Sequence, residues 1–202
     1  MELSSDQIDA LTEVMNIGVG KAASSLSELV GTKVVLKVPR VRVYQIESLS
    51  EIEGFHVDSM LAIISQDFGG GIDGRATLVF PENSAKRLAS LLGAQSFHEE
   101  SELDEESKGI LLEVGNILLN AVLGTISNMV SETLIYEVPV FTLRLFGETI
   151  REVASSAKFS ADARVIQVEA TFDVDGQCIS GSILIFCKFE SLEMLLTSLL
   201  AA

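Results

Sequence analysis

The chain has 202 residues, of which 48% are hydrophobic, so it can bury a substantial core as one large domain or two fused halves. Its formal net charge of -15 argues against a nucleic-acid partner, because phosphate backbones are bound by basic surfaces. The first residues lack the basic flank and apolar run of a secretion signal, and no apolar stretch approaches the ~18 to 20 residues that span a bilayer. We therefore expect a cytoplasmic protein without membrane insertion.

The first half of the chain begins with a predicted amphipathic helix over residues 5 to 30, in which apolar residues recur at three- and four-residue steps. Ser4 and Gln7 fit a capping box at its start, and Gly31 fits a C-terminal cap. Segments rich in Val, Ile and Leu follow, and a short helix closes the half. We expect the strands near 33 to 46, 59 to 67 and 73 to 81, and the short helix near 82 to 93.

An acidic segment separates the two halves, with six acidic residues among the eight from 99 to 106. It can be read as a docking site for a basic partner. We favour a solvated linker, whose carboxylates complement the amino-terminal dipole of the next helix.

The second half repeats the order of the first. We expect a long helix ending near residue 130, three strands, and a closing helix near 190 to 200. The strands are expected near 133 to 146, 163 to 173 and 179 to 188. The order indicates an internal duplication within a single domain over 1 to 202, with a first repeat at about 1 to 95, a linker at about 96 to 102 and a second repeat at about 103 to 202.

We therefore predict an α/β fold of the α+β type, in which each half has the order helix-β-β-β-helix. The halves should pair their strands into one six-stranded sheet with the two long helices on one face, related by a pseudo-twofold axis. The only two cysteines, Cys178 and Cys187, lie in strand-like apolar surroundings, so we expect buried reduced thiols. We see no spacing typical of a metal site.

A polar signature occurs twice, as Glu13-x-x-Asn16 followed by Pro39 and as Glu113-x-x-Asn116 followed by Pro139, with equal internal spacing. A carboxylate and a carboxamide at i and i+3 share one helix face. One such pair would be ordinary solvated surface, but repetition at a fixed distance from a proline weakens that interpretation. The prolines lack an N–H, so we expect them at a sheet edge or strand bend.

Both signatures should point away from the core. At ~100° per residue, the polar stripe of the first helix lies about 130° from the centre of its apolar stripe. That polar stripe consists of Asp9, Glu13, Asn16 and Gly20, and the matching stripe of the second helix consists of Gly109, Glu113, Asn116 and Asn120. We expect two outward-facing sites, one in each half.

These residues resemble the CheC-type chemotaxis phosphatases, the family that includes CheC, CheX and FliY, and the whole chain is most similar to a free-standing CheC with two sites. The family pattern is Asp or Ser, x3, Glu, x2, Asn, x22, Pro. The first copy matches it at Asp9, Glu13, Asn16 and Pro39. The second copy departs from it at Gly109, which removes a side chain and should weaken the second site.

The resemblance implies a cytoplasmic enzyme of two-component signalling that hydrolyses the aspartyl phosphate of a CheY-like response regulator and so ends a chemotaxis signal. It implies that Asn16 and Asn116 orient the attacking water, and that Glu13 and Glu113 pair with the regulator's active-site lysine. Asp9, Pro39 and Pro139 would support this geometry. The enzyme would need no cofactor of its own, and the regulator would hold Mg²⁺. The alternative is a non-catalytic adaptor that binds a response regulator or a CheD-type receptor deamidase.

Overall fold

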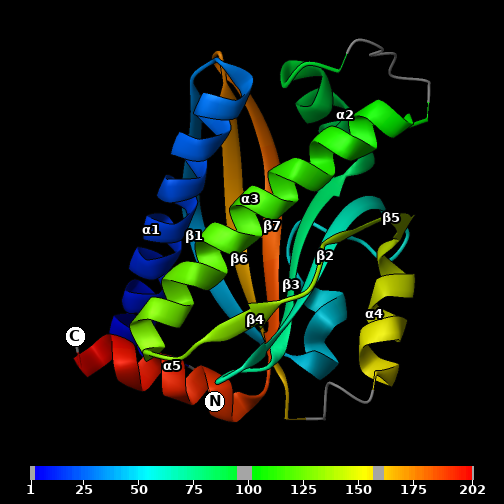
Figure 1. The fold of residues 1–202 in the computed structure, drawn as a ribbon. Coiled ribbons are helices and arrows are strands. Elements are labelled where there is room, and N and C mark those ends of the chain that lie inside the picture. Colours follow the sequence, from blue (N-terminus) through cyan, green and yellow to red (C-terminus); the bar gives the residue numbers. More distant parts are fainter. Residues whose placement is uncertain (1–2, 95–101, 157–161, 202) are drawn as a thin grey trace.

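The computed structural model describes residues 3–94, 102–156 and 162–201. One antiparallel sheet of seven strands is crossed on one face by two long helices, α1 (Ser5–Val30) and α3 (Glu105–Val130) (Figure 1). This arrangement confirms the predicted α/β fold class. The acidic linker expected at 96 to 102 lies almost entirely outside the described residues, so that boundary and the division into repeats stay predictions.

The first half follows the predicted order, except that a 3-10 helix that we did not predict separates its first two strands. The Ser4 side chain accepts a hydrogen bond from the Gln7 N–H, Gln7 Oε1 accepts one from the Ser4 N–H at 2.9 Å, and Gly31 ends α1 with a φ of 67°. Both predicted caps are therefore confirmed. The elements after α1 are β1 (Val34–Gln45), the 3-10 helix η1 (Ile46–Glu51), β2 (Met60–Gly70), β3 (Gly74–Pro81) and α2 (Glu82–Leu91).

The second half differs from the prediction in two places. The strand expected over 133 to 146 is interrupted just before Pro139, so the sheet has seven strands and the expected number of six was wrong. A short helix that we did not predict follows the interrupted strand, at the same place as η1 in the first half. The elements after α3 are β4 (Leu134–Tyr136), β5 (Val140–Leu145), α4 (Phe146–Ser155), β6 (Arg164–Val174), β7 (Gln177–Cys187) and α5 (Phe189–Ala201).

The strand order β1-β6-β7-β3-β2-β4, with β5 also paired to β2, bears out the predicted pseudo-twofold arrangement. At the centre of the sheet, β3 of one half pairs with β7 of the other. At each edge, the first strand of one half pairs with the second strand of the other, as β1 with β6, and as β4 and β5 with β2. Strand pairing thus joins the two halves at the centre of the sheet and at both of its edges.

Pro39 and Pro139 each lie where an edge strand contains one residue more than the strand it pairs with. On β1, the step from Lys37 to Arg40 spans three residues while β6 advances by two, so Pro39 lies in a β-bulge. Between β4 and β5, the step from Tyr136 to Val140 spans four residues while β2 advances by three. A missing N–H is tolerated at such irregularities, as we predicted from the sequence.

The core has two parts, one on each face of the sheet. The larger part lies under α1 and α3 and extends to α2 and α5, and the smaller part lies under η1 and α4. Contrary to our expectation from the sequence, α3 is long and apolar enough to cross a membrane by length and composition. Half of its most apolar stretch is buried inside the fold, as in the core helix of a soluble protein.

The two cysteines differ in their surroundings. Cys187 is buried at the end of β7, as expected, whereas Cys178 is exposed, so the prediction was wrong for this residue. Cys178 lies beside the turn between β6 and β7, where Asp175 and Gly176 take positive φ values and the strands leave the core. Both are free thiols.

Candidate functional site

The first copy of the signature lies on the outer face of α1. Leu11, Met15 and Val19 are buried against the sheet and α3, which turns Asp9, Glu13 and Asn16 to the exposed side of the helix. Within the described part of the chain, the side chains of Glu13 and Asn16 take part in no hydrogen bond or ion pair. Both groups are therefore available to a partner.

The second copy lies on the outer face of α3, but its asparagine is held by neighbours. Glu113 and Gly109 are exposed, whereas Asn116 is half-buried. The Nδ2 of Asn120, one turn further along the helix, donates a hydrogen bond of 2.8 Å to Oδ1 of Asn116. The carboxamide of Asn116 therefore has a defined orientation.

A buried glutamine extends this chain of hydrogen bonds into the sheet. Gln66 on β2 is only 2% exposed, and its Nε2 donates to Oδ1 of Asn120 at 3.0 Å and to the carbonyl oxygen of Glu137 at 2.9 Å. The Glu137 N–H in turn donates to the Asp67 carbonyl at 2.9 Å. The second motif is thereby tied to β2 and to the segment that leads into Pro139.

The two prolines lie in different hollows. Pro139 lines a groove of about 540 Å³ with Glu105, Lys108 and Leu112, which belong to the same helix as Glu113 and Asn116. Pro39 lines a hollow of about 260 Å³ with Phe55 and residues of β6 and β7, and no described residue of α1 lines it. The structure thus brings Pro139, but not Pro39, into a groove with its own motif helix.

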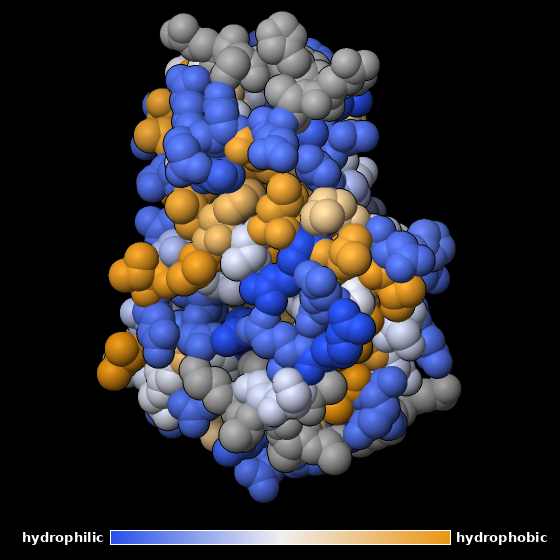
Figure 2. Space-filling view, turned by 90° about the vertical axis from the view of Figure 1, so that its right-hand side faces the viewer, coloured by the Kyte–Doolittle hydropathy of each residue, from blue (hydrophilic) through white to orange (hydrophobic). Residues whose placement is uncertain are grey.

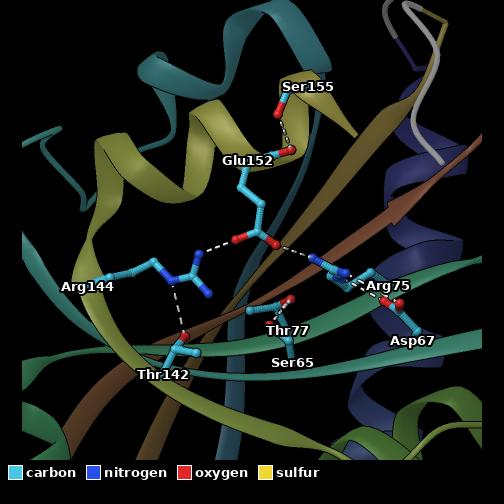
Figure 3. Close-up of polar contacts among 8 residues, drawn as sticks. All are labelled: Ser65, Asp67, Arg75, Thr77, Thr142, Arg144, Glu152 and Ser155. Atoms are coloured by element: carbon cyan, nitrogen blue, oxygen red, sulfur yellow. Dashed lines mark hydrogen bonds and ion pairs between the residues drawn. The ribbon is translucent and has the colours of Figure 1, made fainter. Parts of the chain in front are cut away.

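A second polar cluster lies between α4 and the other face of the sheet (Figure 3). Arg75 Nε donates to Oδ1 of Asp67 at 2.6 Å, and its Nη1 lies 3.0 Å from Oε1 of Glu152. Arg144 pairs with the other oxygen of Glu152. These side chains line a cavity of about 210 Å³. On the side of the molecule that carries β5 and α4, hydrophilic side chains gather near the centre between hydrophobic ones (Figure 2).

The charges of this cluster balance locally. Desolvation favours a higher pKa for Glu152, but the hydrogen bonds and charges of Arg144 and Arg75 outweigh it and hold the pKa of this carboxyl below its ordinary value. Because a carboxylate matches each arginine, the cluster acts as a clasp between α4 and the sheet. Our sequence analysis missed it, although two arginines inside otherwise apolar strand segments were an available signal.

The two outward sites have little chemistry of their own. Neither contains a nucleophile beside a base, and no group of three or more metal-ligating side chains occurs among the residues described above. An exposed carboxylate can bind a cation, and a carboxamide can both donate and accept hydrogen bonds. These side chains can therefore contact a partner through an ion pair and hydrogen bonds.

Comparison with known proteins finds similarity in the first signature and along the whole chain. The CheC-like family model matches residues 7–43, which contain the whole first signature. The CheY-P phosphatase CheC of Bacillus subtilis (strain 168) is 26% identical over 200 residues, covering 98% of this chain and 95% of that protein.

Two solved structures share the fold at low sequence identity. FliY of Thermotoga maritima superposes with a TM-score of 0.73 at 18% identity, covering 100% of this chain and 99% of that one. CheX of Desulfovibrio desulfuricans superposes with a TM-score of 0.52 at 14% identity, covering 87% and 99%. The chain is therefore similar to CheC-type proteins in its first signature, to one CheC over nearly its full length, and to FliY and CheX in its fold.

Proposed function

We propose that this protein is a phosphatase that hydrolyses the aspartyl phosphate of a CheY-like response regulator. The observation that carries the proposal is the outward Glu–Asn pair, present on both long helices of a chain that resembles a CheY-P phosphatase over nearly its whole length. The proposal places the protein in the cytoplasm with its regulator.

The shape of the site supports a protein substrate. Glu13 and Asn16 stand on the convex surface of an exposed helix, which cannot enclose a small molecule. Such a surface can instead enter a cleft in another protein. The phosphoryl group would then lie in the regulator's active site, and this protein would bring its side chains to it.

The chemistry demands little from the phosphatase. An acyl phosphate is already activated, and Mg²⁺ held by the regulator would neutralise charge on the phosphoryl oxygens, so a water in line with the scissile bond is the missing element. Asn16 and Asn116 can accept a hydrogen bond from that water and fix its direction without titrating. Glu13 and Glu113 would pair with the regulator's active-site lysine and set the register of the two proteins.

The direct test follows the decay of a phosphorylated CheY-like regulator with wild type, Asn16→Ala, Asn116→Ala and the double variant. We expect wild type to accelerate decay. In each single variant the altered site should lose on the order of 10²-fold or more of its activity, while the other site keeps its own. The double variant should lose the acceleration. If wild type accelerates the decay of no cognate regulator, the enzyme proposal fails. The surface would then be that of an adaptor for a regulator or a CheD-type deamidase.

The two motif residues should affect different kinetic parameters. Glu13→Gln and Glu113→Gln keep the side-chain shape but remove the charge, so we expect a higher KM for the phosphorylated regulator and a nearly unchanged kcat. Asn16→Ala and Asn116→Ala should mainly lower kcat. A fall in kcat at constant KM for the Glu→Gln variants would contradict the docking role, and initial rates against regulator concentration decide between these outcomes.

A further inference from the structure

The two halves differ at a pair of positions outside the signature. On α3, Asn120 follows Asn116 by one turn and donates to it, whereas on α1 the matching residue is Gly20, which has no side chain. The sheet register identifies the second position. Phe68 on β2 pairs with Tyr136 of β4, and Phe172 on β6 pairs with Leu36 of β1, so the two phenylalanines occupy matching places.

Two residues before these phenylalanines stand Gln66 in one half and Ala170 in the other. Both are buried, at 2% exposure each. Asn120 and Gln66 therefore come from different halves of the chain and hydrogen-bond to each other at the second site, whereas Gly20 and Ala170 occupy the two matching places at the first site. The second site therefore has both residues of the hydrogen-bond chain, and the first site has neither.

Stability alone does not account for Gln66. Its Oε1 is buried and accepts no hydrogen bond from the described residues, which is an unfavourable state for an amide oxygen. Its Nε2, in contrast, uses both hydrogens, on Asn120 and on the Glu137 carbonyl. What the residue gains is a fixed position for Asn120, and through it for Asn116.

We infer that Gln66 and Asn120 are positioning residues that fix the carboxamide of Asn116, which makes the second site the preorganised one of the two. The inference rests on the proposed phosphatase function. The Oδ1 of Asn116 has two lone pairs, of which Asn120 occupies one, so the other stays available to a water. Asn16 has no such support from the described residues and must order its side chain during each encounter, which lowers the fraction of productive encounters.

The test isolates the second site with Asn16→Ala and then adds Asn120→Ala. Regulator-phosphate decay is measured over a range of regulator concentrations. We expect kcat to fall about tenfold with an unchanged KM, because the docking glutamate is untouched and only the orientation of Asn116 is lost. Gln66→Leu, which keeps the volume of the buried side chain, should lower kcat in the same direction. Asn128→Ala, the same substitution at an exposed position of α3, should leave both parameters unchanged.

A second background tests whether the effect passes through Asn116. When Asn116→Ala is already present, Asn120→Ala should cause no further loss, because the group it positions is gone. Melting temperatures of all variants show whether a loss of rate comes from unfolding. If wild type accelerates decay but Asn120→Ala in the Asn16→Ala background keeps its kcat, or raises only KM, this inference is overturned and the proposed function stands. If wild type itself gives no acceleration, it is the proposed function that fails.

Discussion

Asn16 and Asn116 occupy matching positions in the two halves but meet different neighbours. From the sequence, Gly109 in place of an acidic or hydroxyl side chain predicts a weaker second site. The hydrogen bond from Asn120 works in the opposite direction, because it holds Asn116 in one orientation. Asn120 was visible in the sequence as part of the polar stripe. Gln66 was not, since its distance of 54 residues from Asn120 is bridged only by the position of β2 beside α3.

The two thiols give a prediction at the same scale. Burial raises the pKa of Cys187 to about 12, so this group stays protonated and shielded, whereas Cys178 is exposed. In the native protein at pH 8, a thiol reagent such as DTNB should modify one cysteine, and in denaturant two. Cys178→Ser should abolish the native reaction. Native labelling of the Cys178→Ser variant at an unchanged rate would contradict the burial of Cys187.

At the scale of elements, α1 and α3 approach each other closely at Gly18. A Cβ added there would lie 2.9 Å from the Cα of Val122, which is backbone and cannot move aside. A Cβ added at Gly20, two residues further on, would meet nothing within 4 Å. The two glycines are thus a matched pair on one helix, one needed for packing and one not.

Opposite effects on stability follow for the two glycines. Gly18→Ala should lower the free energy of unfolding by about 1–3 kcal/mol, because the helices must move apart. Gly20→Ala should raise it by roughly 0.5–1 kcal/mol, because alanine restricts the unfolded chain and favours the helix. Urea denaturation of both variants measures the difference. Equal effects of the two substitutions would show that the helices do not pack closely at Gly18.

The clasp under α4 gives a prediction that depends on pH. Because the folded-state pKa of Glu152 lies below the ordinary value of 4.5, its ionised form stabilises the protein above that value, and the contribution is lost as the pH falls through the folded pKa. Glu152→Gln should cost about 1 kcal/mol at pH 7, a modest value for a partly exposed carboxylate, and lower Tm by about 2–4 °C. The difference from wild type should shrink below pH 4.

The matched control for this prediction lies on the same helix. Glu148 is exposed in the first turn of α4, so Glu148→Gln should leave Tm nearly unchanged at both pH values. Thermal denaturation at pH 7 and near pH 3.5 measures all three proteins. A Tm difference between Glu152→Gln and wild type that persists at the lower pH would show that the clasp does not depend on the charge of Glu152.

Sequence patterns predicted the long elements well and the short ones poorly. The helix periodicity and its caps located α1 from end to end, because 26 residues give several turns of a consistent apolar stripe. The ten residues of α4 offer fewer than three turns, and we read them as the end of a strand and a connection. The break before Pro139 was also missed, although the proline itself indicated an irregular edge.

At the scale of the whole molecule, the sheet is built mainly from contacts between the halves. Within one half, the described strands form a single hairpin, β2 with β3 or β6 with β7. The first strand of each half pairs only with the other half. A lone hairpin with an unpaired strand is at best marginally stable in water.

Fragments 1–95 and 103–202 should therefore fail to fold separately and should fold when mixed. Circular dichroism and size-exclusion chromatography of each fragment, and of an equimolar mixture, measure this. We expect no cooperative unfolding transition for the single fragments and a 1:1 complex with wild-type-like unfolding for the mixture. A fragment that is monomeric and unfolds cooperatively would contradict the single-domain organisation that we predicted from the sequence.

The pseudo-twofold symmetry would also allow two copies of one fragment to pair with each other. The contact between α1 and α3 disfavours such homodimers. In the intact protein Gly18 packs against Val122, and the matching residues in the other half are Leu118 and Ala22, both buried. A dimer of the first fragment would set Gly18 against Ala22 and leave a gap, whereas a dimer of the second would set Leu118 against Val122 and overfill the space. Alternation of small and large residues between α1 and α3 therefore favours the mixed pair, so any homodimer of either fragment should exchange into the 1:1 complex when the other fragment is added.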